Sequence, residues 1–271
     1  MARATAKKEE STELTVKDQA LATMFGGEMQ GSDTDDRGSE GVTSRDIQIP
    51  RIDLLQDLSP QTKEDEDAYI EGAKPGLLFN SLTGEIYGKD VIIVPIFYAF
   101  VFNIWIERKA GGGFRGSYPT EAEAKAKIPE LAEQEDLREK DFQIVETALN
   151  YVFVVNGQGK IEEASMAFAK TKLSASRKLN ALVRQIGGAR WRRGYQVTAV
   201  SKKNAKGSFY VPEITPIGFT SPEIFAKAEE TYELFSKSFK EGKLNTNFDD
   251  PDNDPDNDVA NRGRHDDDNE I

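Results

Sequence analysis

The chain has 271 residues, with 35 Lys and Arg, 47 Asp and Glu, a formal net charge of −12 and no cysteine. The lack of cysteine excludes disulfides, a thiolate nucleophile and cysteine-ligated metals, and no stretch approaches the ~20 apolar residues of a membrane helix. Apolar residues make up only 38% of the chain, which indicates that part of it does not contribute to a core.

The acidic charge lies mainly at the two ends of the chain. Residues 1–48 hold six basic and ten acidic side chains, and residues 249–271 hold two basic and ten acidic ones. Polar composition and like charges predict a disordered N-terminal arm and a disordered acidic tail. Between them we expect a folded domain over 49–220 and an amphipathic helix within 221–248.

The first half of the folded domain predicts a hairpin, a long strand, a loop and a helix. Strand-like residues flank Thr83-Gly84 in "KPGLLFNSLTGEIYGKD", which predicts the hairpin. Val91–Glu107 contains the longest apolar run and predicts a buried strand bent at Pro95. The glycine-rich "RKAGGGFRGSYP" predicts a connecting loop, and the polar "TEAEAKAKIPELAEQEDLREKD" predicts a helix broken at Pro129.

The second half predicts two strands, a helix, a strand hairpin and a final helix. Phe142–Val155 and Ile161–Thr171 predict strands joined by the turn "NGQG". The segment "KLSASRKLNALVRQIGG" has apolar residues at helical spacing, with Ser174 as the expected N-cap and Gly187-Gly188 as the stop. "RWRRGYQVTAVSKK" and "SFYVPEITPIGF" predict the hairpin, and Ser221 is the expected N-cap of the last helix.

Together these elements predict a mainly β fold with flanking helices, of the α+β class. Three strand regions, a helix and two further strands follow the order of an OB-fold-like five-stranded barrel, a fold that binds oligonucleotides. The same order of elements also fits other small β-barrels.

Positive charge is concentrated in one segment. From Lys170 to Tyr210 the chain has eleven cationic residues and no Asp or Glu, a composition that attracts polyanions. If "RWRRGY" is a strand, alternation places Trp191, Arg193 and Tyr195 on one face, where the rings could stack on unpaired bases. Core packing of Trp191 is the competing interpretation. The predicted nucleic-acid-binding residues are Arg190, Trp191, Arg192, Arg193, Tyr195, Lys170, Lys172, Arg177, Lys178, Arg184, Lys202, Lys203 and Lys206, with Phe114 and Arg115 in the glycine-rich loop.

The sequence gives little support for catalysis, metal binding or dinucleotide binding. The only histidine, His265, lies in the acidic tail, so we expect no Ser-His-Asp set and no His-based metal cluster in the folded part. Carboxylate-only metal chemistry remains open, but the acids of 49–248 show no D-x-D or E-x-K grouping at a strand end, and we predict no metal site, no cofactor and no enzymatic activity. Gly111, Gly113 and Gly116 match G-x-G-x-x-G, but Ser-Tyr-Pro follows instead of an apolar helix, which argues against a dinucleotide site.

The acidic tail is expected to have a role of its own. A tethered polyanion has a high effective concentration near a cationic surface, so the tail could compete with nucleic acid and, when displaced, bind partner proteins. A tail that only increases solubility is the alternative. The tail residues we single out for this role are Asp266, Asp267, Asp268, Glu270 and Ile271.

The acidic tail, the OB-like order of elements and the basic-aromatic segment resemble the bacteriophage single-stranded DNA-binding proteins of the T7 type. "IPRIDLLQDLSP", "KPGLLFNSLTGEIYG" and "SMAFAKTKLSASRKLNALV" are also similar to stretches of phage proteins. The resemblance implies coating of unpaired DNA in replication and recombination, homodimer formation, contacts of the tail with polymerase and helicase-primase, and a location in the host bacterial cytoplasm. A strand-annealing recombination mediator and an assembly protein without nucleic-acid affinity remain alternatives.

Overall fold

The computed structural model describes residues 38, 48–155, 161–204 and 207–240. The chain divides into two units, Met1–Val42 and Thr43–Ile271, and every described helix and strand lies in the second unit. The acidic tail lies outside the described residues, and the N-terminal arm does so except for Gly38 and Gln48.

A small antiparallel sheet precedes the main one in the chain. It consists of β1 (Ile52–Leu54), β2 (Leu78–Asn80) and β3 (Ile86–Gly88), in that spatial order. Gly84, with φ of 73°, lies in the turn between β2 and β3, a backbone region that glycine adopts without strain. The predicted hairpin around Thr83-Gly84 is therefore confirmed.

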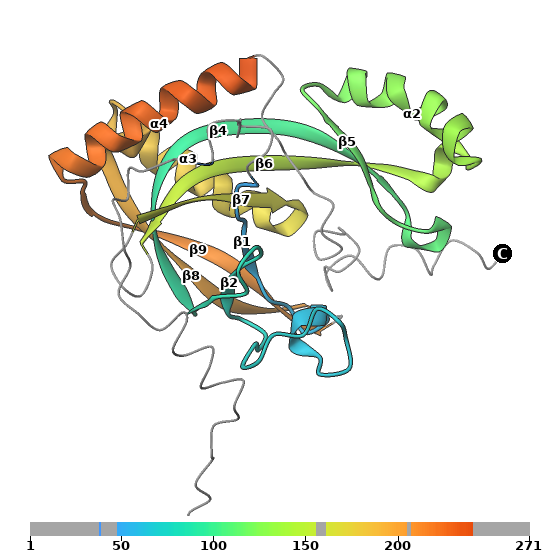
Figure 1. Ribbon diagram of the computed structural model, residues 1–271, viewed down its shortest axis with the longest axis horizontal. Helices are drawn as coiled ribbons and strands as arrows, with labels where there is room; N and C mark the ends of the chain where they lie inside the picture. The colour runs from blue at the N-terminus through green and yellow to red at the C-terminus, as the bar shows by residue number, and fades with distance from the viewer. Residues whose placement is uncertain (1–37, 39–47, 156–160, 205–206, 241–271) are drawn as a thin grey trace, which may run out of the picture. The chain divides into compact units, whose positions relative to one another are not determined.

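The main sheet has six antiparallel strands, and five of them form one hydrogen-bonded path (Figure 1). Its two central strands, residues 90–106 and 142–155, pair from Ile92 opposite Val155 to Ile106 opposite Phe142, with an irregularity just after Pro95. The five strands in spatial order are β7 (Ile161–Ala169), β6 (Phe142–Val155), β4 (Asp90–Ile106), β8 (Arg193–Asn204) and β9 (Gly207–Phe219).

The edge of β4 opposite β6 is shared by two strands. β8 pairs with its first residues, from Asp90 to Ile93, whereas β5 (Phe114–Tyr118) pairs with it from Phe102 onward. Between these two stretches the short 3-10 helix η5 (Arg190–Arg192) packs against β4. This placement brings the arginine-rich turn to the middle of the longest strand.

Three α-helices occur in the described residues (Figure 1): α2 (Glu121–Glu135), α3 (Leu173–Ile186) and α4 (Pro222–Lys240). α4 packs on β4 and η5, and α2 packs farther along the β4–β6 hairpin, on β4, β5 and β6. α3 contacts β6, β7 and β9. Two signals set helix ends as expected: Gly187 caps α3, and Ile224 N–H donates to Ser221 Oγ at the start of α4. The prediction that Ser174 is the N-cap of α3 is wrong, because the helix already begins at Leu173 and the Ser174 hydroxyl donates to Thr171 O instead.

The prediction of a mainly β fold with helices is confirmed, but a closed barrel is not. Within the described residues, no ladder joins β7 to β9. The chain before β2 crosses this gap, because Arg51 forms an isolated parallel bridge with Ser165 of β7. At the other side the Gln56 amide donates to Tyr210 O and accepts from Tyr210 N–H, both at 2.9 Å.

Two predicted features of the chain after β4 are wrong. The glycine-rich segment contains β5 instead of a plain loop, because Phe114 finds an apolar partner in Trp105, with ring centroids 5.4 Å apart. α2 continues through Pro129, because the burial of Leu131 and Ala132 beyond the proline offsets the backbone hydrogen bond it cannot make.

The core continues onto the outer face of the sheet beneath α4. Trp191 is 7% exposed and packs with Val94 and Phe153 of the sheet. Its ring lies 5.9 Å from Phe225 and 5.1 Å from Tyr232 of α4, centroid to centroid. Trp191 is thus the main contact between η5, the sheet and the last helix.

We therefore expect Trp191→Ala to lower the free energy of unfolding by about 3–5 kcal/mol, the usual cost of deleting a buried large aromatic ring. Phe219→Ala is the matched control, since Phe219 is 67% exposed and its loss should change stability by less than about 0.5 kcal/mol. Urea denaturation measures both. Equal midpoints for the two variants would contradict the assignment of Trp191 to the core.

Candidate nucleic-acid interface

The predicted cationic residues do not form one continuous channel. Arg193 and Lys203 lie near opposite ends of β8, ten residues apart, which corresponds to roughly 33 Å of extended strand. Lys202 and Lys203 are exposed near the β8–β9 turn, whereas Lys170 and Lys172 are half-buried in a short helical turn before α3. Lys206 lies outside the described residues.

The cations of α3 face solvent. Arg177, Lys178 and Arg184 are exposed, and Lys178 Nζ lies 3.4 Å from Glu213 Oε1 of β9. Exposed pairs of this kind contribute little to stability. These three side chains fit an ordinary solvated helix face as well as a phosphate-binding one.

The predicted stacking role of Trp191 and Tyr195 is wrong. Residues 190–192 form η5, so strand alternation does not apply to Trp191, which is buried beneath α4. Tyr195 lies in β8 but is only 1% exposed, on the inner side of the sheet with Val197. Neither ring can reach a base without unfolding part of the core.

Phe114 and Arg115 are also occupied by contacts within the protein. Phe114 packs on Trp105, and Arg115 Nε donates to Glu135 Oε1 of α2 at 2.5 Å. The prediction that they border a nucleic-acid groove stays a prediction, and the ion pair with Glu135 reduces the charge that Arg115 offers to an anion.

One exposed cluster combines an aromatic ring with cations. Phe219, the last residue of β9, lies opposite Arg193 of β8, and its ring is 67% exposed. The guanidinium carbons of Arg192 and Arg193 lie 5.7 Å and 5.6 Å from the ring centroid. Arg193 also donates to Ile217 O at 2.8 Å, which holds its side chain in place. We call Arg192, Arg193 and Phe219 the Phe219 cluster.

Neither arginine of the Phe219 cluster forms an ion pair with a described residue. Both guanidiniums therefore keep their full charge available to an external anion. Sequence analysis missed Phe219 because it lies outside the cation-rich segment. In the β8–β9 hairpin Phe219 pairs with Arg193, and a prediction of this strand register from the sequence would have placed the ring beside the arginines.

Arg190 has different surroundings from its two neighbours. Its Nη2 donates to Asn150 Oδ1 at 2.7 Å, and its guanidinium carbon lies 5.3 Å from the Tyr98 ring centroid. Asn150 is fully buried and donates in turn to Ser176 Oγ of α3 at 3.2 Å. Burial lowers the pKa of Arg190 to about 10, so it remains a cation at neutral pH in a poorly hydrated position. We call Arg190, Asn150 and Tyr98 the Arg190 cluster.

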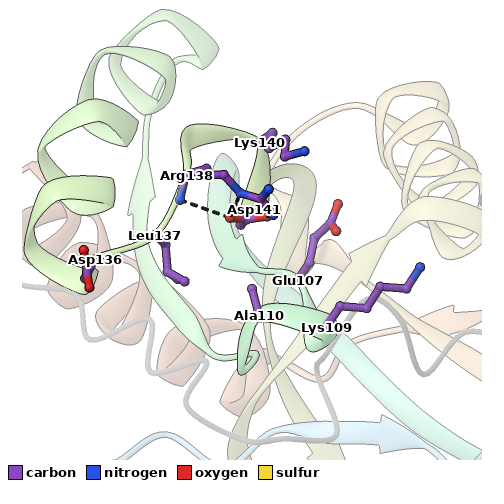
Figure 2. A pocket seen from close by; sticks show the side chains of 8 residues that line it. All are labelled: Glu107, Lys109, Ala110, Asp136, Leu137, Arg138, Lys140 and Asp141. Atoms are coloured by element: carbon purple, nitrogen blue, oxygen red, sulfur yellow. Dashed lines mark hydrogen bonds and ion pairs between the residues drawn. The ribbon is translucent and has the colours of Figure 1, made fainter.

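A hollow of about 720 Å³ lies at the far end of the β4–β6 hairpin, beside the end of α2 (Figure 2). Arg138 Nη2 and Asp141 Oδ1 lie 2.9 Å apart, and the hydrogen bonds from Arg138 hold the pKa of Asp141 below its usual value. The balance of charges, three cations and three carboxylates, favours neither a polyanion nor a cation. The lining residues are Glu107, Lys109, Ala110, Asp136, Leu137, Arg138, Lys140 and Asp141.

The described residues provide neither a metal-binding cluster nor a membrane-spanning helix. No group of three or more His, Cys, Asp or Glu side chains is placed to hold a metal ion. None of the described helices is long and apolar enough to cross a membrane. The tail residues singled out from the sequence, including Asp266–Asp268, lie outside the described residues.

Comparison with known proteins places the chain among phage proteins. A family model described as "Pam3 phage gp34-like protein" matches residues 17–241, and the chain belongs to this family. No curated protein and no solved structure matches it. The phage origin implied by the sequence resemblance is therefore supported, and the description of the family states no activity.

The Arg190 cluster makes a prediction about stability. Asn150→Ala removes the one acceptor that the described residues offer the Arg190 side chain, and also the partner of Ser176 Oγ, so we expect it to lower the free energy of unfolding by about 2–3 kcal/mol. Gln196→Ala is the control, because the Gln196 amide donates to Asp90 at an exposed position and should cost less than about 0.5 kcal/mol. Similar urea midpoints for both variants would show that the cluster is not structurally important.

Proposed function

We propose that this phage protein binds single-stranded nucleic acid without sequence preference, as a coating protein for unpaired DNA in replication and recombination. The observation that carries the proposal is the Phe219 cluster, an exposed ring flanked by two arginines without ion pairs among the described residues. A base can stack on a ring of this kind while the guanidiniums contact phosphate oxygens.

The strand order supports the same proposal. The path β7-β6-β4-β8-β9, with α3 between β7 and β8 in the chain, is that of an OB-fold barrel opened between its third and fifth strands. The crossing segment from Arg51 to Gln56 occupies the open side. We therefore propose an OB-like fold, in which the β4–β6 connection carrying β5 and α2 is a large insertion.

Electrostatics favours a single strand over a duplex. Ten of the eleven cations between residues 170 and 210 are described, and they lie on short helices, a helix face and a strand, with several far apart. A flexible strand can follow dispersed cations and unstack its bases on an exposed ring, whereas a stiff duplex keeps its bases inside. Binding of this kind depends strongly on salt because condensed counterions are released.

The test is a titration of fluorescent oligo-dT at two salt concentrations, with a duplex of equal length as comparison. We expect Phe219→Ala to weaken oligo-dT binding about tenfold, because stacking on an aromatic ring contributes about 1–3 kcal/mol per base. Arg192→Ala should weaken it and reduce the salt dependence. Leu234→Ala is the control, since Leu234 is a 63% exposed apolar residue of α4, outside the Phe219 cluster.

Two outcomes would overturn the proposal. If the wild-type protein shows no salt-dependent affinity for oligo-dT, the chain is not a single-strand-binding protein. If Phe219→Ala binds as tightly as Leu234→Ala, the Phe219 cluster is not the site. A protein that binds oligo-dT and also pairs complementary strands in an annealing assay would act as an annealing protein on the same surface.

A further inference from the structure

We propose that the Arg190 cluster is a built binding site for one phosphate oxyanion, held by the Arg190 guanidinium between Asn150 and Tyr98. The identification of that oxyanion as a backbone phosphate of a bound strand rests on the proposed function. The anion site itself rests on the geometry of the cluster alone.

The hydrogen bonding of the Arg190 guanidinium is incomplete. Among its three nitrogens only Nη2 has a hydrogen-bond partner in the described part of the chain, Asn150 Oδ1. Nε is shielded from solvent and has no hydrogen-bond partner, whereas Nη1 has none either but is not shielded. An anion can therefore reach Arg190 from the Nη1 edge, where an arginine presents the planar donor pattern that fits phosphate.

The charge of Arg190 is not compensated by any described carboxylate. Arg190 forms no ion pair with a described residue, and its guanidinium contacts the Tyr98 ring in a cation–π interaction instead of a carboxylate. A partly buried cation without a counter-ion is costly, since neither a ring nor an amide replaces the water it has lost. The lowered pKa of Arg190, caused chiefly by burial, reflects this cost. A bound oxyanion would offset it.

The guanidinium is also held in place before any ligand binds. Asn150 is fully buried, and its amide is fixed between Arg190 and Ser176 of α3. Tyr98 covers the guanidinium, and Trp191, the next residue, anchors the turn beneath α4. Such preorganisation lowers the entropic cost of binding an anion.

Half-buried rings continue along β4 from this site. Phe100 and Phe102 follow Tyr98 at alternate positions, and their ring centroids lie 5.6 Å apart. A phosphate on Arg190 would thus leave the adjoining bases close to apolar rings. This neighbourhood favours a polynucleotide phosphate over a free anion as the natural ligand.

The test uses the full chain and has two arms. In the first, inorganic phosphate replaces chloride at constant ionic strength, and we expect the wild-type Tm to rise by about 3 °C. The rise should disappear in Arg190→Gln and in Asn150→Asp, because the latter supplies a competing internal carboxylate at hydrogen-bond distance from the guanidinium. Arg177→Gln, which removes an exposed arginine of α3, should retain the full rise.

In the second arm, oligo-dT is titrated at several salt concentrations. Arg190→Gln should weaken binding about tenfold and reduce the slope of log affinity against log salt by about 0.7, the value for one phosphate contact with a single strand. Arg177→Gln serves again as the control.

The two arms separate this inference from the proposed function. A phosphate-dependent rise that needs Arg190, in a protein without affinity for oligo-dT, would keep the anion site and reject the proposed function. Tight oligo-dT binding that is unchanged by Arg190→Gln, with no phosphate-dependent rise in the wild type, would reject the anion site and keep the function. A phosphate-dependent rise in Tm that persists in both Arg190→Gln and Asn150→Asp would also reject the anion site.

Discussion

The burial of Trp191 against α4 is the contact on which the arrangement of the three arginines depends. Because β8 leaves β4 after Ile93 and β5 joins it only from Phe102, η5 can pack on the exposed edge between them. Trp191 then fills the space beneath α4, which directs Arg190 toward Asn150 on the inner side of the sheet. Arg192 and the following Arg193 are left beside Phe219 at the surface. One buried ring thus separates two cationic clusters of different character.

Local signals made most of the elements predictable. Gly187 and Ser221 end and begin helices through contacts within a few residues, and β6 spans Phe142–Val155 as the apolar pattern predicted. Long-range contacts could not be read in this way. The structure of β5 depends on Trp105 across a strand pair, and the burial of Trp191 depends on α4, more than thirty residues later. The alternation rule failed at Trp191 because a 3-10 turn replaces the first three residues of the expected strand.

The candidate site, too, was predictable from local sequence only in part. The absence of Asp and Glu from residues 170–210 correctly identified a segment whose arginines at 190, 192 and 193 lack ion pairs with described residues. It could not reveal that Phe219 provides the exposed ring, since that residue reaches Arg193 only through the β8–β9 register. Nor could it distinguish Arg190 from its neighbours, because the difference arises from Asn150 and Tyr98 on other strands. Composition therefore located the charge, and the fold determined which cations remain available.

The central claim is that an unpaired strand lies on the surface formed by β8, β9 and η5. Photochemical cross-linking with an oligonucleotide of 5-iodouracil, followed by mass spectrometry of the peptides, tests it most directly. The account predicts adducts on Phe219 and none on Trp191 or Tyr195, which are buried. Adducts confined to residues remote from both arginine clusters, or no adducts at all, would contradict it.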